Sequence, residues 1–130
     1  MELQAADYII LLVDDLERAL AFYTQVLGLP LGHRAREYAQ LRTGTTRLGL
    51  YTREAMARLL GVPLQRPEPE AAGFELGFKV PDVDAAFAEL LAAGVTAVTP
   101  PTTRPWGQRT AYVRDPDGHL IELAQDLGRV

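Results

Sequence analysis

An internal repeat constrains the fold of this chain more than any other feature of its sequence. The segment DYIILLVDDLERALAFYTQVLGL (7–29) aligns with FELGFKVPDVDAAFAELLAAGV (74–95) once a single residue is dropped. The ends of the two halves also correspond, with RLGLY (47–51) matching LIELA (120–124). A chain that repeats itself in this way is expected to build the same structural unit twice.

Each half predicts a strand, then a helix, then further strands. The apolar run that opens each half is typical of a strand. An aspartate follows as a helix N-cap: Asp15 or Asp14 in the first half and Asp82 in the second. Apolar residues then recur at helical spacing, and Gly28 and Gly94 stand where each helix should end. The remaining sequence has room for about three strands in each half. We therefore predict two βαβββ modules and an α+β fold.

Length and composition indicate one domain made of both modules. The chain has 130 residues, of which 48% are hydrophobic, enough to form a core. Module one is expected at about 5–52 and module two at about 73–126, within a single domain of 1–130. Between them lies a linker at about 53–72, in which Arg53 to Leu60 could form a short helix. The stretch PLQRPEPEAAG (63–73) is proline-rich and acidic, which indicates a mobile linker.

Charge and cysteine content narrow the classes of partner and site. The formal net charge is −4, with both signs interspersed, which argues against nucleic acid as a partner. The absence of cysteine excludes disulfides and thiolate metal sites. No apolar run approaches a membrane span, and MELQAADYII does not have the pattern of a secretory signal. We therefore expect a cytoplasmic protein without a membrane partner.

Several motifs resemble those of one known superfamily. The stretches VDDLERALAFYTQVLGL, ELGFKVPDVDAAFAELLAAGV and PWGQRTAYVRDPDGHLIEL, together with the paired modules, resemble the vicinal oxygen chelate superfamily. That group includes glyoxalase I, fosfomycin-resistance proteins, extradiol dioxygenases and bleomycin-resistance proteins. The resemblance implies curved sheets that form a half-open barrel around a cavity, with helices outside, and it implies a homodimer. Function is not implied so closely, because one fold hosts many chemistries.

The resemblance also implies where a metal would be held. Metal-using members place ligands on the first and last strand of each module, and the repeat locates these positions at Tyr8, Gly49, Glu75 and Glu122. Glu75 and Glu122 keep a ligand type that the family uses. Glycine offers no ligand, and a neutral phenol is a poor one unless the metal acidifies it.

The two histidines do not complete this set. His33 and His119 match none of the four positions, so a facial triad of two histidines and a carboxylate cannot be assembled. The resemblance therefore favours the absence of a metal cofactor. The alternative is a divalent ion, Mn, Mg, Ni, Zn or Fe, held by Glu75 and Glu122 with water.

Glu122 has two interpretations. Strand alternation places Ile121 and Leu123 on one face and Glu122 on the other, facing either water or a pocket. It is a ligand-binding or catalytic carboxylate, or it is a structural one satisfied by a donor such as Arg109. If Glu75 and Glu122 share a cavity without metal, their repulsion raises the pKa of one of them and favours a cationic or hydrogen-bond-donating guest.

Aromatic residues would supply stacking area for such a guest. Trp106, the only tryptophan, lies in a proline-rich loop, in the PWG.R pattern that lines the pocket in many members of the family. The full set of predicted ligand-binding residues is Trp106, Arg109, Tyr8, Tyr38, Tyr51 and Tyr112.

Two functions of different classes follow from these patterns. The first is a small-molecule binding protein of the bleomycin-resistance type, an antibiotic-resistance function in which a cationic or aromatic compound is sequestered without a complete metal site. The second is a metal-dependent lyase, isomerase or thiol transferase of the glyoxalase I or fosfomycin-resistance type that uses Glu122. A metal-free enzyme with Glu122 and Tyr8 as acid–base partners is a third alternative.

Overall fold

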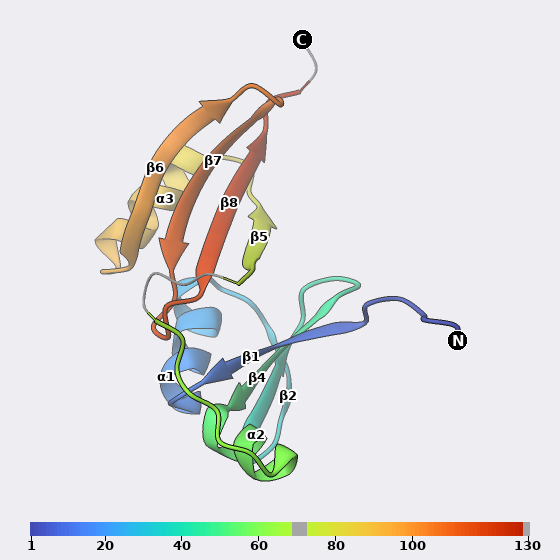
Figure 1. Ribbon diagram of the computed structural model, residues 1–130. Helices are drawn as coiled ribbons and strands as arrows, with labels where there is room; N and C mark the ends of the chain where they lie inside the picture. Colours follow the sequence, from blue (N-terminus) through green and yellow to red (C-terminus); the bar gives the residue numbers. More distant parts are fainter. Residues whose placement is uncertain (69–72, 129–130) are drawn as a thin grey trace. The chain divides into compact units, whose positions relative to one another are not determined.

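A computed structural model describes residues 1–68 and 73–128, and its chain forms two compact units, Met1–Arg66 and Pro67–Val130 (Figure 1). Each unit contains a strand, a helix and three further strands in that order. The predicted pair of βαβββ modules and the α+β fold class are thus confirmed.

The first unit builds a mixed four-stranded sheet in the order β1-β4-β3-β2. Strand β1 runs parallel to β4, whereas β3 is antiparallel to both β4 and β2. The elements are β1 (Tyr8–Val13), α1 (Leu16–Ala21), the π-helical turn η1 (Phe22–Val26), β2 (Leu31–Arg34), β3 (Tyr38–Leu41) and β4 (Arg47–Thr52).

The second unit repeats this topology, with strand order β5-β8-β7-β6. Strand β5 runs parallel to β8, and β7 is antiparallel to both β8 and β6. The elements are β5 (Glu75–Lys79), α3 (Val83–Ala92), β6 (Thr96–Arg104), β7 (Gln108–Arg114) and β8 (Leu120–Asp126).

The helix signals that the repeat predicted are present in both units. The Asp15 carboxylate accepts a hydrogen bond from the Arg18 amide at 3.2 Å, and Asp82 caps α3 in the same way. Asp14, the other candidate cap, instead pairs with arginines. Gly28 and Gly94 both adopt positive φ, at 77° and 82°, which glycine accepts without the steric cost of a Cβ atom.

The first helix is less regular than the apolar spacing predicts. Its α-helical part ends at Ala21, and residues Phe22–Val26 continue as a π-helical turn. The Thr24 hydroxyl donates to the carbonyl of Leu20 at 2.7 Å within this stretch. A side chain that bonds to the backbone one turn earlier competes with the regular helical ladder and can bend the helix.

One face of each sheet forms the core of its unit. Strand alternation puts Leu11, Val13, Leu48 and Leu50 on one face of the first sheet, all of them buried. The second sheet does the same with Ala111, Val113, Ile121 and Leu123. Helix α1 contacts β4, and α3 contacts β7 and β8. The residues in between point to the opposite face, and Glu122, a candidate site residue, is one of them.

The segment after β4, still within the first unit, contains the short helix that was predicted. Helix α2 spans Arg53–Leu60 and begins at Thr52, whose hydroxyl accepts a hydrogen bond from the Ala55 amide at 3.1 Å. The predicted mobile linker is described as far as residue 68, and residues 69–72 lie outside the described part. Within residues 1–68 and 73–128, no helix is long and apolar enough to cross a membrane.

Candidate functional site

Glu122 faces away from the core, and a tyrosine on the neighbouring strand binds it. Its neighbours Ile121 and Leu123 are buried against α3, so alternation turns Glu122 to the other side of the sheet. Tyr112 of β7 lies directly opposite Glu122 in the antiparallel register. The Tyr112 hydroxyl donates to Oε2 of Glu122 at 2.6 Å. A bond this short between a neutral donor and a carboxylate lies in the range of charge-assisted hydrogen bonds.

Glu75 joins this pair from β5. Gly77 lies opposite Glu122 in the parallel register, and Glu75, two residues earlier, points to the same face. A Cβ atom at Gly77 would lie 3.3 Å from Oε1 of Glu122, so the glycine leaves room for that carboxylate. We call the group of Glu75, Tyr112 and Glu122 the carboxylate cluster.

The electrostatics of the carboxylate cluster favour protons and cations. Loss of hydration raises the pKa of the Glu75 carboxyl, and the negative charge of Glu122 raises it further. The pKa of Tyr112 is also raised, first by its hydrogen bond to Glu122, then by burial and by the charges of Glu122 and Glu75. Such a site can hold a proton or accept hydrogen bonds from a cationic guest. The direction of the Glu75 shift is the one expected from the sequence if the two carboxylates share a cavity.

Trp106 lies at one end of the same sheet and is held by a polar chain. Its indole N–H donates to Oε1 of Gln108 at 2.9 Å, and the Gln108 amide donates to Asp126 at 3.0 Å. Lys79 donates to the other oxygen of Asp126 at 2.6 Å. The Lys79 ammonium, with Gln108 second, lowers the pKa of the Asp126 carboxyl. Trp106 as a whole is 63% exposed.

Sequence reasoning did not single out Gln108, Asp126 or Lys79. Gln108 is four residues before Tyr112, Asp126 is four after Glu122, and Lys79 is four after Glu75. Strand alternation places residues at even separations on one face. Counting even separations along each strand from Glu75, Tyr112 and Glu122 could therefore have identified Lys79, Gln108 and Asp126 as residues of the same face.

Arg109 does not serve as the donor to Glu122, and that prediction is wrong. Its guanidinium forms two hydrogen bonds to the carboxylate of Asp84 on α3, at 2.8 and 2.9 Å. Arg109 is three residues from Tyr112, an odd separation, so it points to the helix side of the sheet. The donor to Glu122 is Tyr112 instead. We therefore leave Arg109 out of the proposed ligand site.

His119 has a role in the turn before β8. Its Nδ1 lies 2.7 Å from the Asp115 carboxylate, which also accepts the backbone amides of Asp117 and His119. Asp115 is 5% exposed. A buried carboxylate that satisfies several donors in one turn is a structural feature, and His119 is part of it.

The equivalent face of the first unit is aromatic where the second is acidic. Tyr38 lies over Gly49: a Cβ atom at Gly49 would come within 2.7 Å of the Tyr38 hydroxyl and 2.8 Å of its ring. Tyr38 and Tyr51 pack edge to face, with ring centroids 6.0 Å apart. Burial raises the pKa of the Tyr38 phenol, and the nearby Tyr8 adds to this effect. Tyr8 itself is 59% exposed at the start of β1.

These residues do not fit a transition-metal site of the kind that the resemblance implies. Gly49 has no donor atom, and the ring of Tyr38 occupies the space in which a side chain there would begin. Within residues 1–68 and 73–128, no three or more His, Asp or Glu side chains gather as a metal-holding group. Zinc, nickel and iron sites normally need three or four protein ligands with imidazole among them.

Comparison with known proteins agrees with this fold. The family model described as "Glyoxalase/Bleomycin resistance protein/Dioxygenase superfamily" matches residues 5–123. An uncharacterized protein of Bacillus subtilis, YraH, is 40% identical over 121 residues, covering 90% of this chain and 94% of its own.

Solved structures agree as well. A glyoxalase/bleomycin resistance protein/dioxygenase family enzyme from Burkholderia phytofirmans superposes with a TM-score of 0.83 at 26% identity, covering 95% of this chain and 100% of that one. A glyoxalase-related enzyme from Fulvimarina pelagi gives a TM-score of 0.82 at 27% identity, with 95% and 89% covered. With the family model matched over almost the whole length, this chain belongs to the glyoxalase/bleomycin resistance protein/dioxygenase superfamily.

Proposed function

We propose that this protein binds a small organic cation and sequesters it without a metal ion. The observation that carries the proposal is the carboxylate cluster, in which Glu75 and Glu122 share one sheet face and Tyr112 hydrogen-bonds to Glu122. Two neighbouring carboxylates repel each other, and a bound cation relieves that repulsion. An ammonium or amidinium group supplies both the positive charge and the hydrogen-bond donors that these oxygens accept.

An aromatic portion of the ligand would suit the same face. Trp106 lies beyond Gln108 on the sheet that carries the cluster, and its indole N–H is already engaged by Gln108. With the N–H occupied, the ring faces remain for stacking or for a cation–π contact. The ligand class that we propose for these groups is a planar aromatic cation, which is narrower than the cationic or aromatic compound expected from the sequence.

The alternative function is a metal-dependent lyase, isomerase or thiol transferase that uses Glu122. The observation in its favour is that Glu75 and Glu122 both remain at positions where metal-using relatives have ligands, and that they face the same way. Two carboxylates with water can hold a hard ion such as magnesium or manganese. The Tyr38 ring over Gly49 weighs against a fuller ligand set.

A matched pair of probes tests the proposal directly. Benzamidinium and benzamide have nearly the same shape, but the first is a cation. Isothermal titration calorimetry measures both affinities without depending on the distance of the probe from Trp106, which lies beyond Gln108 on the same sheet. We expect benzamidinium to bind at least about tenfold more tightly than benzamide, as a charge-assisted hydrogen bond predicts.

Two variants distinguish binding at the carboxylate cluster from a general effect of the protein's net charge. Glu122→Gln should remove most of the preference for benzamidinium, whereas Glu89→Gln, the same change at an exposed position on α3, should leave it intact. Equal affinity for the two probes would refute the proposal. So would about one equivalent of metal that survives dialysis of tag-free protein and is lost in Glu122→Gln, since that result supports the metal-dependent alternative.

A further inference from the structure

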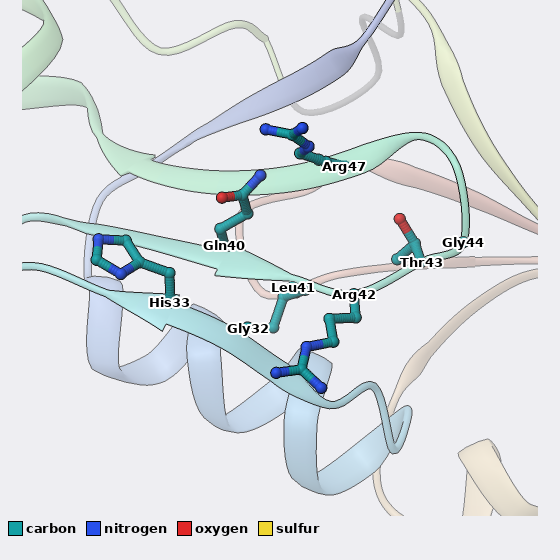
Figure 2. A pocket seen from close by; sticks show the side chains of 8 residues that line it. All are labelled: Gly32, His33, Gln40, Leu41, Arg42, Thr43, Gly44 and Arg47. Atoms are coloured by element: carbon teal, nitrogen blue, oxygen red, sulfur yellow. The ribbon is translucent and has the colours of Figure 1, made fainter.

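We infer that the first unit carries a separate binding site for an oxyanion, the carboxylate or phosphate group of a small molecule. The site is a pocket of about 520 Å³ lined by residues of β2, β3, the β3–β4 loop and the start of β4 (Figure 2). It involves none of the residues of the carboxylate cluster and lies within the first unit. The inference therefore does not depend on the proposed function.

The charge of the pocket lining is positive. Arg42 and Arg47 both line it, and among the described residues no aspartate or glutamate does. In the described part of the chain, the Arg42 guanidinium has no hydrogen bond or ion pair. Arg47 has Asp7 at 3.9 Å, with both side chains more than half exposed, a pair of little energetic weight. Both guanidinium groups are therefore available to a ligand.

The positive charge of the pocket contrasts with the negative net charge of the chain as a whole. The first unit has 8 Lys and Arg against 7 Asp and Glu, a net charge of +1, and the second has 5 against 10, a net charge of −5. Their sum is the chain's −4. An acidic protein as a whole repels anions, so a local cationic pocket is needed to attract one.

The strand register brings further donors to the pocket. His33 lies opposite Gln40, and Gln40 lies opposite Gly49, so His33 and Gln40 share a face. Arg47 is two residues before Gly49 and points the same way. The Gln40 carboxamide is half-buried and has no hydrogen-bond partner in the described residues. Figure 2 shows these three side chains on β2, β3 and β4.

Gly32 makes room for Arg42. A Cβ atom at Gly32 would lie 3.2 Å from Cγ of Arg42 and 3.2 Å from the carbonyl oxygen of Gln40. The stem of Arg42 thus lies against β2 because that position has no side chain (Figure 2). The strand pairing is irregular between Leu31 and His33 at the same place. The irregular pairing of β2 and the absence of a side chain at Gly32 together position the Arg42 guanidinium along the pocket.

Carboxylates and phosphates match these groups chemically. The planar guanidinium presents paired N–H donors with the spacing of two oxyanion oxygens. The Gln40 amide and the His33 imidazole add single donors, so the site can surround an anion with nitrogen donors from three strands. Neither covalent chemistry nor a metal is required.

Backbone NMR titration tests this site with two probes, inorganic phosphate and acetate. Chloride replaces each anion at constant ionic strength, and the amides of Gly32, Thr43 and Gly44 are followed. We expect saturable shifts at these amides. Arg42→Gln and Arg47→Gln should each weaken binding about tenfold or more, as loss of a hydrogen bond to a charged group predicts. Tighter binding of phosphate would assign a phosphate ligand, and tighter binding of acetate a carboxylate ligand.

Two further variants make the result decisive. Arg36→Gln removes the same charge from the turn between β2 and β3, outside the pocket lining, and should change the affinity less than twofold. Gly32→Ala keeps every charge but displaces Arg42, and should also weaken binding. Shifts that never saturate, or that Arg36→Gln reduces as much as Arg42→Gln does, would overturn the inference. Unchanged amide shifts at the buried strand residues Leu11, Leu48 and Leu50 of the first unit would show that the variants remain folded.

Discussion

The hydrogen bond between Tyr112 and Glu122 predicts a measurable change in the titration of the tyrosine. The acceptor and its charge raise the pKa of Tyr112 because they stabilise the neutral phenol. In Glu122→Gln, the Tyr112 pKa should therefore fall toward the ordinary value of about 10. Tyrosine Cζ chemical shifts between pH 8 and 12 would measure it.

The same shift has a consequence for stability. A phenol whose pKa is higher in the folded state contributes stability below the unfolded-state pKa, and this contribution is lost as pH rises through the folded-state pKa. Glu122→Gln should thus reduce the part of the alkaline stability loss that Tyr112 causes. Glu89→Gln, on α3, is the control and should leave the Tyr112 titration unchanged. The same Tyr112 pKa in the wild type, Glu122→Gln and Glu89→Gln would show that the hydrogen bond between Tyr112 and Glu122 does not form.

The Tyr38 ring over Gly49 can be tested by a double-mutant cycle. Gly49→Ala should cost about 1–3 kcal/mol, the usual penalty for overpacking, since its Cβ atom would meet the ring at 2.7–2.8 Å. In a Tyr38→Ala background the same change should cost much less. Urea denaturation would measure both steps.

A glycine on the other sheet provides the matched control. Gly77→Ala places a Cβ atom 3.3 Å from Glu122 Oε1, the end of a flexible side chain that can shift. It should be milder than Gly49→Ala. Additive effects of Gly49→Ala and Tyr38→Ala would mean that the ring does not fill the space above Gly49.

At the residue scale, the sequence predicted the positions of side chains better than their partners. Alternation correctly turned Glu122 away from Ile121 and Leu123. Arg109 was named as a candidate donor to Glu122, but it lies three residues from the observed donor, Tyr112, and on the other face. A charged group looks like the obvious partner for a carboxylate, but in a sheet the parity of the position decides which groups can meet.

At the scale of the elements, the ion pair between Asp84 and Arg109 joins α3 to β7 and should give an acid-dependent contribution to stability. The Arg109 guanidinium lowers the pKa of the Asp84 carboxyl. A lowered carboxyl pKa contributes stability above the unfolded value of about 3.9, and this contribution is lost as pH falls through the folded value. Asp84→Asn should therefore lower the urea midpoint at pH 7 and have less effect at pH 3.

Glu89 on the same helix provides a control for net charge. Glu89→Gln makes the same charge change at an exposed position, and its effect should be smaller at pH 7. Because both partners of the ion pair reach solvent, salt should weaken its contribution. An Asp84→Asn effect that is equal at pH 7 and pH 3 would contradict a role for the ion pair.

The helix boundaries show what local sequence can and cannot specify. The Asp15 and Asp82 caps and the glycines after each helix were predictable, because each depends on one residue and its neighbouring backbone. The π-helical turn Phe22–Val26 was not, because apolar spacing alone does not distinguish it from an α-helix. Phe22 and Tyr23 are both buried there, and their rings meet edge to face at 5.0 Å.

At the scale of the whole molecule, one repeated scaffold carries two kinds of surface. The strands that end each unit match in the repeat, yet one presents Gly49 beneath Tyr38 and the other presents Glu122 beside Tyr112. The repeat predicted the backbone of both units, because core positions such as Leu50 and Leu123 are retained. It could not predict their chemistry, since the faces away from the core are free to diverge.

The presence of a separate core in each unit predicts that a core truncation destabilises mainly the unit that contains it. Leu50 and Leu123 occupy matching positions in the repeat and are 0% and 4% exposed. Truncation of either to alanine should cost about 2–5 kcal/mol. A unit of this size has a small free energy of unfolding. We therefore expect Leu50→Ala to reduce amide hydrogen-exchange protection more in the first unit than in the second. Leu123→Ala should do the reverse, because local opening follows the weakened core. Equal loss of protection in both units from either variant would instead show that the chain opens as one cooperative structure.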